Sequence, residues 1–229
     1  MIGIIGAMSI EIDGIVEKMT GKTDYVFNGI KFTVGNLCSK AVVACKCGIG
    51  KVNSSMATML MKVKFDVDTV INIGVAGGWK TLKQGDIVIA DKTVEHDYDG
   101  TPDGLPLGQV HGFDSPYIDC DEQLVKSLEN ICKENEVSFV VGTVATGDQF
   151  IASNEKSAQI TQNFGAVAYD MESGAINHAC KNLGLKFVAI RAISDNGNND
   201  AMDDFYTFVT KAAKISEEIV CTYLKTLNA

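Results

Sequence analysis

Short apolar runs that end in glycine or in polar residues are the feature that most limits how this chain can fold. They occupy residues 2–6, 41–47, 69–73 and 187–190. Runs of this kind form strands that are buried on both faces, as in parallel sheets covered by helices. Between them, apolar residues recur at helical spacing from Ser9 onward and again over residues 52–63. Strands that alternate with helices predict a layered α/β fold.

The remaining segments continue this alternation. Asn28-Gly29 favours a tight hairpin turn between two strands. The glycine-rich residues 74–78 are expected to form a loop, and the long segment 96–117, which holds all three prolines, a surface excursion. In the helix 52–63, Met56, Met59, Leu60 and Val63 are expected to face inward. Further strands are expected at 25–27, 30–34, 86–90, 139–145 and 166–169, and further helices at 155–163, 172–183 and 204–227.

Length and charge narrow the function. The 229 residues contain no Pro-, Ser- or charge-rich divider, so residues 1–229 are expected to form a single domain. A net charge of −9 without a basic block argues against nucleic acid or an anionic membrane as partner and favours a small molecule. The seven cysteines lie scattered in apolar segments, as in proteins of a reducing compartment. No run approaches the roughly 20 apolar residues of a membrane span, so we expect a cytoplasmic protein.

Three carboxylates follow predicted strands. Asp195 ends the polar stretch after residues 187–190, Glu11 follows the opening strand, and Glu172 follows the strand 166–169. In open α/β sheets the ligand crevice lies beyond the carboxyl ends of the strands, so the three acids could converge on one crevice suited to proton transfer. Each acid taken alone could instead cap a helix or lie in its first turn.

Other motifs predict neither a phosphate-binding loop nor a metal site. Residues 48–51 lack the spacing of a triphosphate-binding loop, and residues 3–6 lack the third glycine of the dinucleotide fingerprint. Cys45 and Cys47 have no second pair or nearby histidine at metal-ligand spacing. The three histidines are far apart in sequence. We therefore predict no metal.

Six sequence blocks carry a resemblance to a known family. They are residues 3–8 with Glu11, then 48–52, 72–78, 147–151, 170–172 and 191–195. In this order they resemble the 5′-methylthioadenosine/S-adenosylhomocysteine nucleosidases, a hydrolytic branch of the nucleoside phosphorylase superfamily, over essentially the whole chain. The resemblance implies a three-layer αβα sandwich with a mixed, partly barrelled central sheet. It also implies a homodimer in which the partner helps to close each site.

The resemblance assigns a role to each acid. It implies that Asp195 is the general acid that protonates the five-membered ring of adenine, and that Glu11 is the base that activates water. Glu172 resembles the residue that binds the ribose hydroxyls and favours an oxocarbenium-like transition state. An ordinary Asp has a pKa near ~3.9, so Asp195 needs a raised pKa to donate a proton at pH 7. The implied reaction hydrolyses 5′-substituted adenine nucleosides with water as the only co-substrate, so no cofactor is expected.

Further contacts are implied in the same way. Phe150 and Met171 resemble apolar walls of the base pocket, and the backbone of Ile151 resembles the reader of the adenine edge. Ser194 is similar to a residue that supports Asp195, and Arg191 to one that orients the Glu11 carboxylate and the water. The ribose and tail contacts would come from Met8, Ile49, Val75 and Phe205.

Two alternative functions remain open. A phosphorylase would need to hold a phosphate dianion, usually with arginines, and Arg191 is the only arginine in the chain. The early loop carries Glu11, which repels phosphate and suits water activation. A purine-binding protein without turnover is the other alternative, and the three intact acids argue against it.

The 5′ substituent is the least determined part of the substrate. Val75 stands where the family commonly has serine. In residues 99–111, which in the family reach across the dimer to the tail subsite, an expected aromatic near Asp103 is missing and His111 replaces a frequent proline. Asp103 or His111 would favour a more polar tail, as in S-adenosylhomocysteine, or 5′-deoxyadenosine, whereas Leu105, Leu107 or Phe113 would restore an apolar wall.

Overall fold

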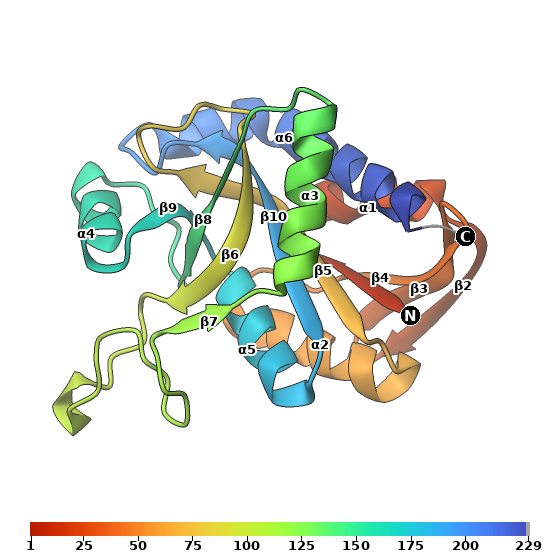
Figure 1. Ribbon diagram of the computed structural model, residues 1–229, viewed down its shortest axis with the longest axis horizontal. Helices are drawn as coiled ribbons and strands as arrows, with labels where there is room; N and C mark the ends of the chain where they lie inside the picture. The colour runs from red at the N-terminus through yellow and green to blue at the C-terminus, as the bar shows by residue number, and fades with distance from the viewer. Residues whose placement is uncertain (228–229) are drawn as a thin grey trace.

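The computed structural model describes residues 1–227 (Figure 1). The elements follow in the order β1 (Ile2–Gly6), α1 (Ser9–Lys18), β2 (Thr20–Phe27), β3 (Ile30–Leu37), β4 (Lys40–Lys46), α2 (Lys51–Phe65), β5 (Thr69–Gly78), β6 (Ile87–Glu95), the 3₁₀ helix η1 (Thr101–Asp103), β7 (Tyr117–Asp119), α3 (Glu122–Glu134), β8 (Phe139–Thr146), α4 (Asn154–Phe164), β9 (Ala166–Asp170), α5 (Ser173–Leu183), β10 (Lys186–Asp195) and α6 (Ala201–Thr226).

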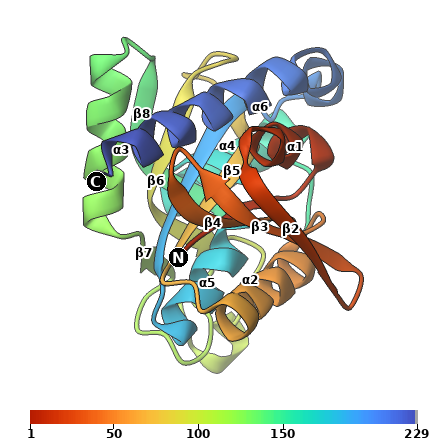
Figure 2. The same cartoon turned by 90° about the vertical axis from the view of Figure 1, so that its right-hand side faces the viewer.

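A mixed ten-stranded sheet lies between two layers of helices. Helices α1, α3 and α6 cover one face, and α2 and α5 cover the other, as the two ribbon views show (Figures 1 and 2). Helix α4 packs beside β8 and β9 at one end of the sheet. The predicted three-layer αβα sandwich is thus confirmed.

Part of the sheet closes into a barrel. Strand β10 pairs in parallel with β5 and antiparallel with β6. Strands β8 and β9 complete the ring, since β6 pairs with β8, β8 with β9, and β9 with β5. Strands β1, β4, β3 and β2 extend the sheet from β5. Because β1, β5 and β10 run parallel, their carboxyl ends meet at the same edge, which is where ligands bind in such sheets.

The expected loop at residues 74–78 is wrong, because β5 continues through Gly78. Both Gly77 and Gly78 pair with β9, and residues 74–77 also pair with β10. The glycines at these positions let neighbouring side chains approach the strand closely, and they do not end it. A Cβ atom at Gly74 would overlap the Glu11 carboxylate and the Arg191 guanidinium.

The predicted inward face of α2 is also wrong. Met56, Met59 and Val63 are among the exposed apolar residues, at 46–64% exposure, and Leu60 is only half-buried. The buried residues of α2 are Ser54, Ala57, Thr58 and Met61. Small side chains let α2 pack closely against α5, and the hydroxyls of Ser54 and Thr58 donate to helix carbonyls, so their burial leaves no donor unpaired. The bulky stripe therefore faces outward.

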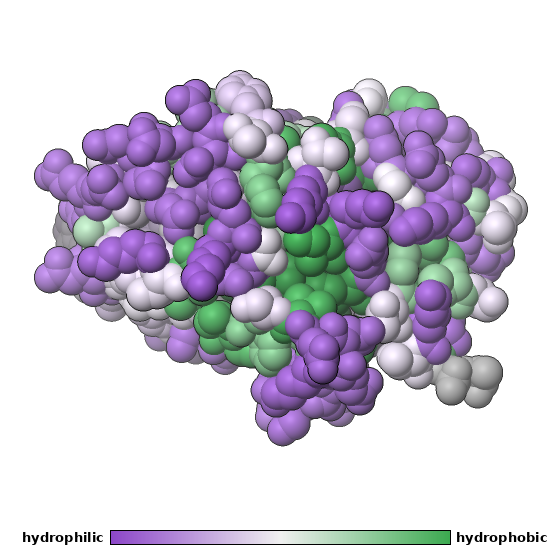
Figure 3. All heavy atoms as spheres, turned by 90° about the horizontal axis from the view of Figure 1, so that it is seen from above, coloured by the Kyte–Doolittle hydropathy of each residue, from purple (hydrophilic) through white to green (hydrophobic). Residues whose placement is uncertain are grey.

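Seen from above, from the side where α6 lies in Figure 1, the surface is mainly hydrophilic. A smaller hydrophobic area lies near the centre of this face (Figure 3). Helix α6 buries its apolar side against β10 and β5 and carries the basic and acidic residues outward, as an amphipathic surface helix does. Among residues 1–227, no helix is both long enough and apolar enough to cross a membrane.

Candidate active site

A cavity of about 500 Å³ opens at the carboxyl ends of β1, β5, β9 and β10. All the predicted site residues except Arg191 line it. The lining comprises Ala7, Met8, Glu11, Ile49, Val75, Ala76, Gly77, Gln149, Phe150, Ile151, Tyr169, Asp170, Met171, Glu172, Ser194, Asp195, Met202, Phe205 and Tyr206. The structure therefore brings the three carboxylates into one crevice, together with the apolar residues expected around them.

Asp195 ends β10 with only 2% of its surface exposed. The pairing of β10 with β5 shifts register between Ile193 and Asp195, and such irregularities re-aim side chains at the ends of strands. One carboxylate oxygen accepts the Gly197 N–H at 2.9 Å, and the other accepts the Ser194 hydroxyl at 2.9 Å. Burial raises the pKa of Asp195, although these two hydrogen bonds oppose the shift. Asp195 therefore holds a proton more readily than an ordinary aspartate.

Glu11 lies in the first turn of α1 and is almost fully buried. Its Oε2 accepts the N–H groups of Ala7 and Met8, at 2.8 and 2.9 Å, and its Oε1 accepts the Val75 N–H at 2.9 Å. Burial raises the pKa of Glu11, while the Arg191 charge and the three N–H groups lower it. The carboxylate is thus fixed in orientation at the floor of the cavity, where its charge is costly unless compensated.

Glu172 occupies the N-cap position of α5, directly after β9. Its Oε1 accepts the Gly50 N–H at 2.9 Å, and its Oε2 lies 3.6 Å from Nη2 of Arg191. Burial raises the pKa of Glu172 to about 7, with Arg191 acting in the opposite direction and Asp170 adding to the rise. At neutral pH this carboxyl group is therefore partly protonated, and a positive charge in the cavity would favour its ionised form.

Arg191 lies beneath the cavity rather than in its wall. The side chain is fully buried and forms ion pairs with Asp170, at 2.7 Å, and with Glu172, at 3.6 Å. It also donates hydrogen bonds to Asn72 and Ser173. Its charge also lowers the pKa of Glu11, and the expected role of Arg191 in orienting the Glu11 carboxylate and a water stays a prediction. A buried charge needs ion-pair partners, and the turn between β9 and α5 supplies two of them.

Several lining residues were not singled out from the sequence. Asp170 precedes Met171 in one of the family blocks, and Met202 and Tyr206 lie three residues before and one residue after Phe205 at the start of α6. Phe205 contacts both Phe150 and Tyr206 edge to face, with ring centroids 5.8 and 5.6 Å apart. The helical spacing of Met202 and Phe205 was the available signal that this turn of α6 covers the cavity.

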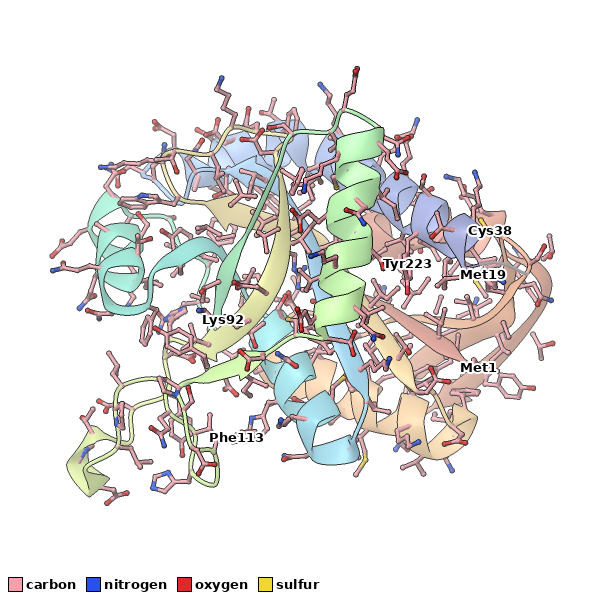
Figure 4. All side chains as sticks on the ribbon, in the orientation of Figure 1. Met1, Met19, Cys38, Lys92, Phe113 and Tyr223 are labelled. Atoms are coloured by element: carbon pink, nitrogen blue, oxygen red, sulfur yellow. The ribbon has the colours of Figure 1, made fainter. Side chains whose placement is uncertain are left out.

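The loop expected to select the 5′ substituent does not reach its own chain's cavity. Nδ1 of His111 shares a hydrogen bond of 2.7 Å with the Tyr98 hydroxyl, and Nε2 lies 3.3 Å from the Asp103 carboxylate. Phe113, labelled in Figure 4 on the loop that projects below the sheet, packs edge to face on His178 of α5 at 4.7 Å. Residues 99–113 therefore remain assigned to the tail subsite only by resemblance.

The charged side chains of the cavity wall are all acidic. Among the described residues that line it, none is Lys, Arg or His. Within residues 1–227, no group of three or more His, Cys, Asp or Glu side chains could hold a metal ion. The site thus offers carboxylates and backbone groups, set in an apolar wall, for acid–base chemistry on a small organic molecule.

Comparisons with known proteins agree with this geometry. The family model of the phosphorylase superfamily matches residues 1–225. The 5′-methylthioadenosine/S-adenosylhomocysteine nucleosidase of Shewanella baltica (strain OS195) is 39% identical over 229 residues, which cover 99% of this chain and 97% of that protein.

Solved structures of two enzymes have the same fold. The 5′-methylthioadenosine/S-adenosylhomocysteine nucleosidase of Neisseria meningitidis, in complex with methylthio-immucillin-A, matches with a TM-score of 0.96 at 35% identity, covering 99% of both chains. The futalosine hydrolase of Helicobacter pylori strain 26695 matches with a TM-score of 0.95 at 31% identity, covering 99% of this chain and 97% of that one. By the extent of these matches, the chain belongs to the 5′-methylthioadenosine/S-adenosylhomocysteine nucleosidase family of the phosphorylase superfamily.

Proposed function

We propose that this protein hydrolyses the N-glycosidic bond of 5′-substituted adenine nucleosides, giving adenine and the 5′-substituted ribose. The observation that carries the proposal is the convergence of Asp195, Glu11 and Glu172 on one cavity whose described wall has no cationic side chain. The family relatives named above support the same chemistry. The proposed substrates are methylthioadenosine, S-adenosylhomocysteine and 5′-deoxyadenosine, and hydrolysing the first two would recycle by-products of adenosylmethionine.

Each acid has one task in the proposed mechanism. Protonated Asp195 donates its proton to the five-membered ring of adenine, so the bond to the anomeric carbon breaks and its electron pair leaves with a neutral base. Glu11 takes a proton from water, whose oxygen bonds to the anomeric carbon. Ionised Glu172 binds the ribose hydroxyls and stabilises the positive charge that develops on the ring. One acid for the leaving group and one base for water is the division of labour used by inverting glycosidases.

The contacts around the base and the ribose complete the proposal. Phe150 and Met171 would sandwich adenine, and the backbone of Ile151 would read its edge. Met8, Ile49, Val75 and Phe205 would contact the ribose and the tail. Ser194 would support Asp195 through the hydroxyl it donates to that carboxylate. Arg191 would orient the Glu11 carboxylate and the water, from a position fixed by its ion pairs with Glu172 and Asp170.

Release of the free purine base from a panel of 5′-substituted adenosines, adenosine, inosine and futalosine tests this function. We expect release of adenine from methylthioadenosine and S-adenosylhomocysteine in phosphate-free buffer. Added phosphate should not raise the rate, because the carboxylates of the cavity wall repel a dianion and no cationic side chain of the wall attracts it. A strict requirement for phosphate, with ribose 1-phosphate products, would establish a phosphorylase instead. Binding without release under either condition would leave a nucleoside-binding protein.

We also infer a homodimer, from an apolar stripe on α2. The stripe consists of Val52, Met56, Met59 and Val63, which lie on one helix face and are 46–69% exposed. A contiguous exposed apolar surface of this kind on a folded protein usually marks an interface. A second copy of the same chain satisfies it with self-complementary packing, as in most two-fold dimers.

Charge placed in the α2 stripe is expected to separate the dimer. In Val63→Glu each subunit would have to bury a carboxylate in the interface, so we expect a shift toward monomer on size-exclusion chromatography with light scattering. Val26→Glu is the matched control, because Val26 is equally exposed, at 66%, but lies on β2. If both variants keep the mass of the wild type, the stripe is not the interface.

The state of the cysteines is evidence on the cellular location of the protein. All seven cysteines are free, and six of them are buried. Buried free thiols are typical of proteins kept in a reducing compartment, which supports our proposal of a cytoplasmic location.

A further inference from the structure

Two loops that line the cavity are tied together outside it. Residues 48–51, after β4, contribute Ile49 to the wall, and residues 147–151, after β8, contribute Gln149, Phe150 and Ile151. The Lys51 N–H of the first loop donates to Oδ1 of Asp148 in the second loop at 2.8 Å. The two loops therefore share a direct hydrogen bond.

Asp97, which follows β6, closes this link into a triangle with Lys51 and Asp148. Its Oδ1 accepts a hydrogen bond from Nζ of Lys51 at 2.7 Å, and its Oδ2 accepts the Asp148 N–H at 2.9 Å. One carboxylate thus holds both loops, each through a different oxygen. Charge-assisted hydrogen bonds of this kind are stronger than neutral ones and fix geometry more tightly.

Two corners of the triangle are largely shielded from solvent, whereas Asp148 is exposed. The Lys51 and Asp97 side chains are only 18% and 15% exposed. Nζ of Lys51 also pairs with Glu95 at 3.0 Å, and the other Glu95 oxygen lies 2.9 Å from Nδ1 of His178. Although burial opposes it, the Lys51 ammonium and the Asp148 N–H hold the pKa of Asp97 below its ordinary value. The Lys51–Asp97 pair is therefore ionised near neutral pH.

The first loop also holds one of the three carboxylates. Gly50, next to Lys51, donates its N–H to Oε1 of Glu172. Gly50 has a positive φ of 99°, which disfavours any other residue, and a Cβ there would lie 2.9 Å from Oδ1 of Asp148. The position of the loop that orients Glu172 thus depends on Asp148, and through it on Asp97.

We propose that Lys51, Asp97 and Asp148 are positioning residues that set the separation between Glu172 and the wall formed by Phe150 and Ile151. The inference rests on the proposed function, in which that wall holds adenine and Glu172 holds the ribose. A nucleoside spans both contacts, whereas free adenine touches only the wall. Misplacement of a catalytic group by about 1 Å can lower the rate by a factor on the order of 10². A small increase in the separation of the two loops would therefore lower the turnover rate.

The test compares a ligand that spans both contacts with one that does not. In Asp97→Ala we expect kcat/KM for methylthioadenosine to fall at least about tenfold, with the Kd of adenine, measured by calorimetry, changed by less than about threefold. Lys51→Met should behave alike, and Lys51→Arg should recover most of the activity because it keeps a cation between Glu95 and Asp97. Asp24→Ala, which breaks the exposed Lys31–Asp24 ion pair on β2 and β3, is the control and should match the wild type.

The outcomes separate positioning from stability and from the proposed function. Equal losses in adenine affinity and in kcat/KM, with a lower melting temperature, would mean a structural role and overturn the inference, as would unchanged kinetics in Asp97→Ala. If Asp97→Ala fails to fold, Asp148→Ala, which removes only the acceptor of the Lys51 N–H, gives the same comparison. The proposed function is tested first in the same assay, because it fails only if the wild type itself releases no adenine.

Discussion

Asp195→Asn is expected to abolish adenine release while the nucleoside still binds. The amide has the same size, its oxygen can still accept the Gly197 N–H, and its NH2 group can donate to the Ser194 hydroxyl oxygen, but it has no acidic proton to give to the base. General acid catalysis is typically worth about 10²–10⁴ in rate, so kcat should fall by at least that factor. Single-turnover release of adenine measures the rate, and calorimetry with methylthioadenosine measures binding.

The matched control for Asp195 is Asp203→Asn. Asp203 lies at the start of α6 and is exposed, and the same change of charge there should leave kcat unaltered. Turnover near the wild-type rate in Asp195→Asn would remove Asp195 from the role of acid. A matching loss of binding affinity would mean that the carboxylate serves mainly to hold the substrate.

Glu11→Gln should lower kcat by about 10²–10⁴ as well, because an amide cannot accept a proton from water. The substitution has a second cost, since both Glu11 oxygens accept N–H groups and the amide nitrogen cannot replace either of them. One buried N–H then loses its acceptor, which destabilises the fold by roughly 1–3 kcal/mol. We therefore expect a lower melting temperature together with the loss of rate.

The loss of rate and the loss of stability can be separated. Rates are compared well below the melting temperature, and adenine affinity, which does not depend on water activation, should remain close to that of the wild type. Glu17→Gln, an exposed change on the same helix, is the control for charge. If added phosphate restored turnover to Glu11→Gln, the acceptor would not be water and the hydrolytic assignment would have to be withdrawn.

The convergence of the acids could be predicted because it follows from strand direction. Asp195 and Glu172 each lie where a buried strand ends, and Glu11 begins the helix after the opening strand, so their meeting needed only the rule that ligands bind at the carboxyl ends of parallel strands. Apolar runs are long and strongly patterned, and the strands they predicted are present in the sheet.

The errors arise where a local pattern has two physical meanings. An apolar stripe at helical spacing, as on α2, shows that one face avoids water, but not whether the same chain or a second one covers it. Glycines at residues 74–78 are equally compatible with a turn and with a strand that another side chain approaches closely. The ion pairs of Arg191 with Asp170 and Glu172 were not predicted, because they depend on how β9 and α5 meet, and no spacing within residues 191–195 encodes that.

The closed ring of strands has a consequence for motion. Since β10 is hydrogen-bonded to β5 on one side and to β6 on the other, the residues that lead to Asp195 belong to the part of the fold that opens last. We therefore expect substrate entry and product release to depend on the first turns of α6 and on the loops that line the cavity, rather than on β10. The proposed general acid, Asp195, would then keep its orientation while the residues around it move.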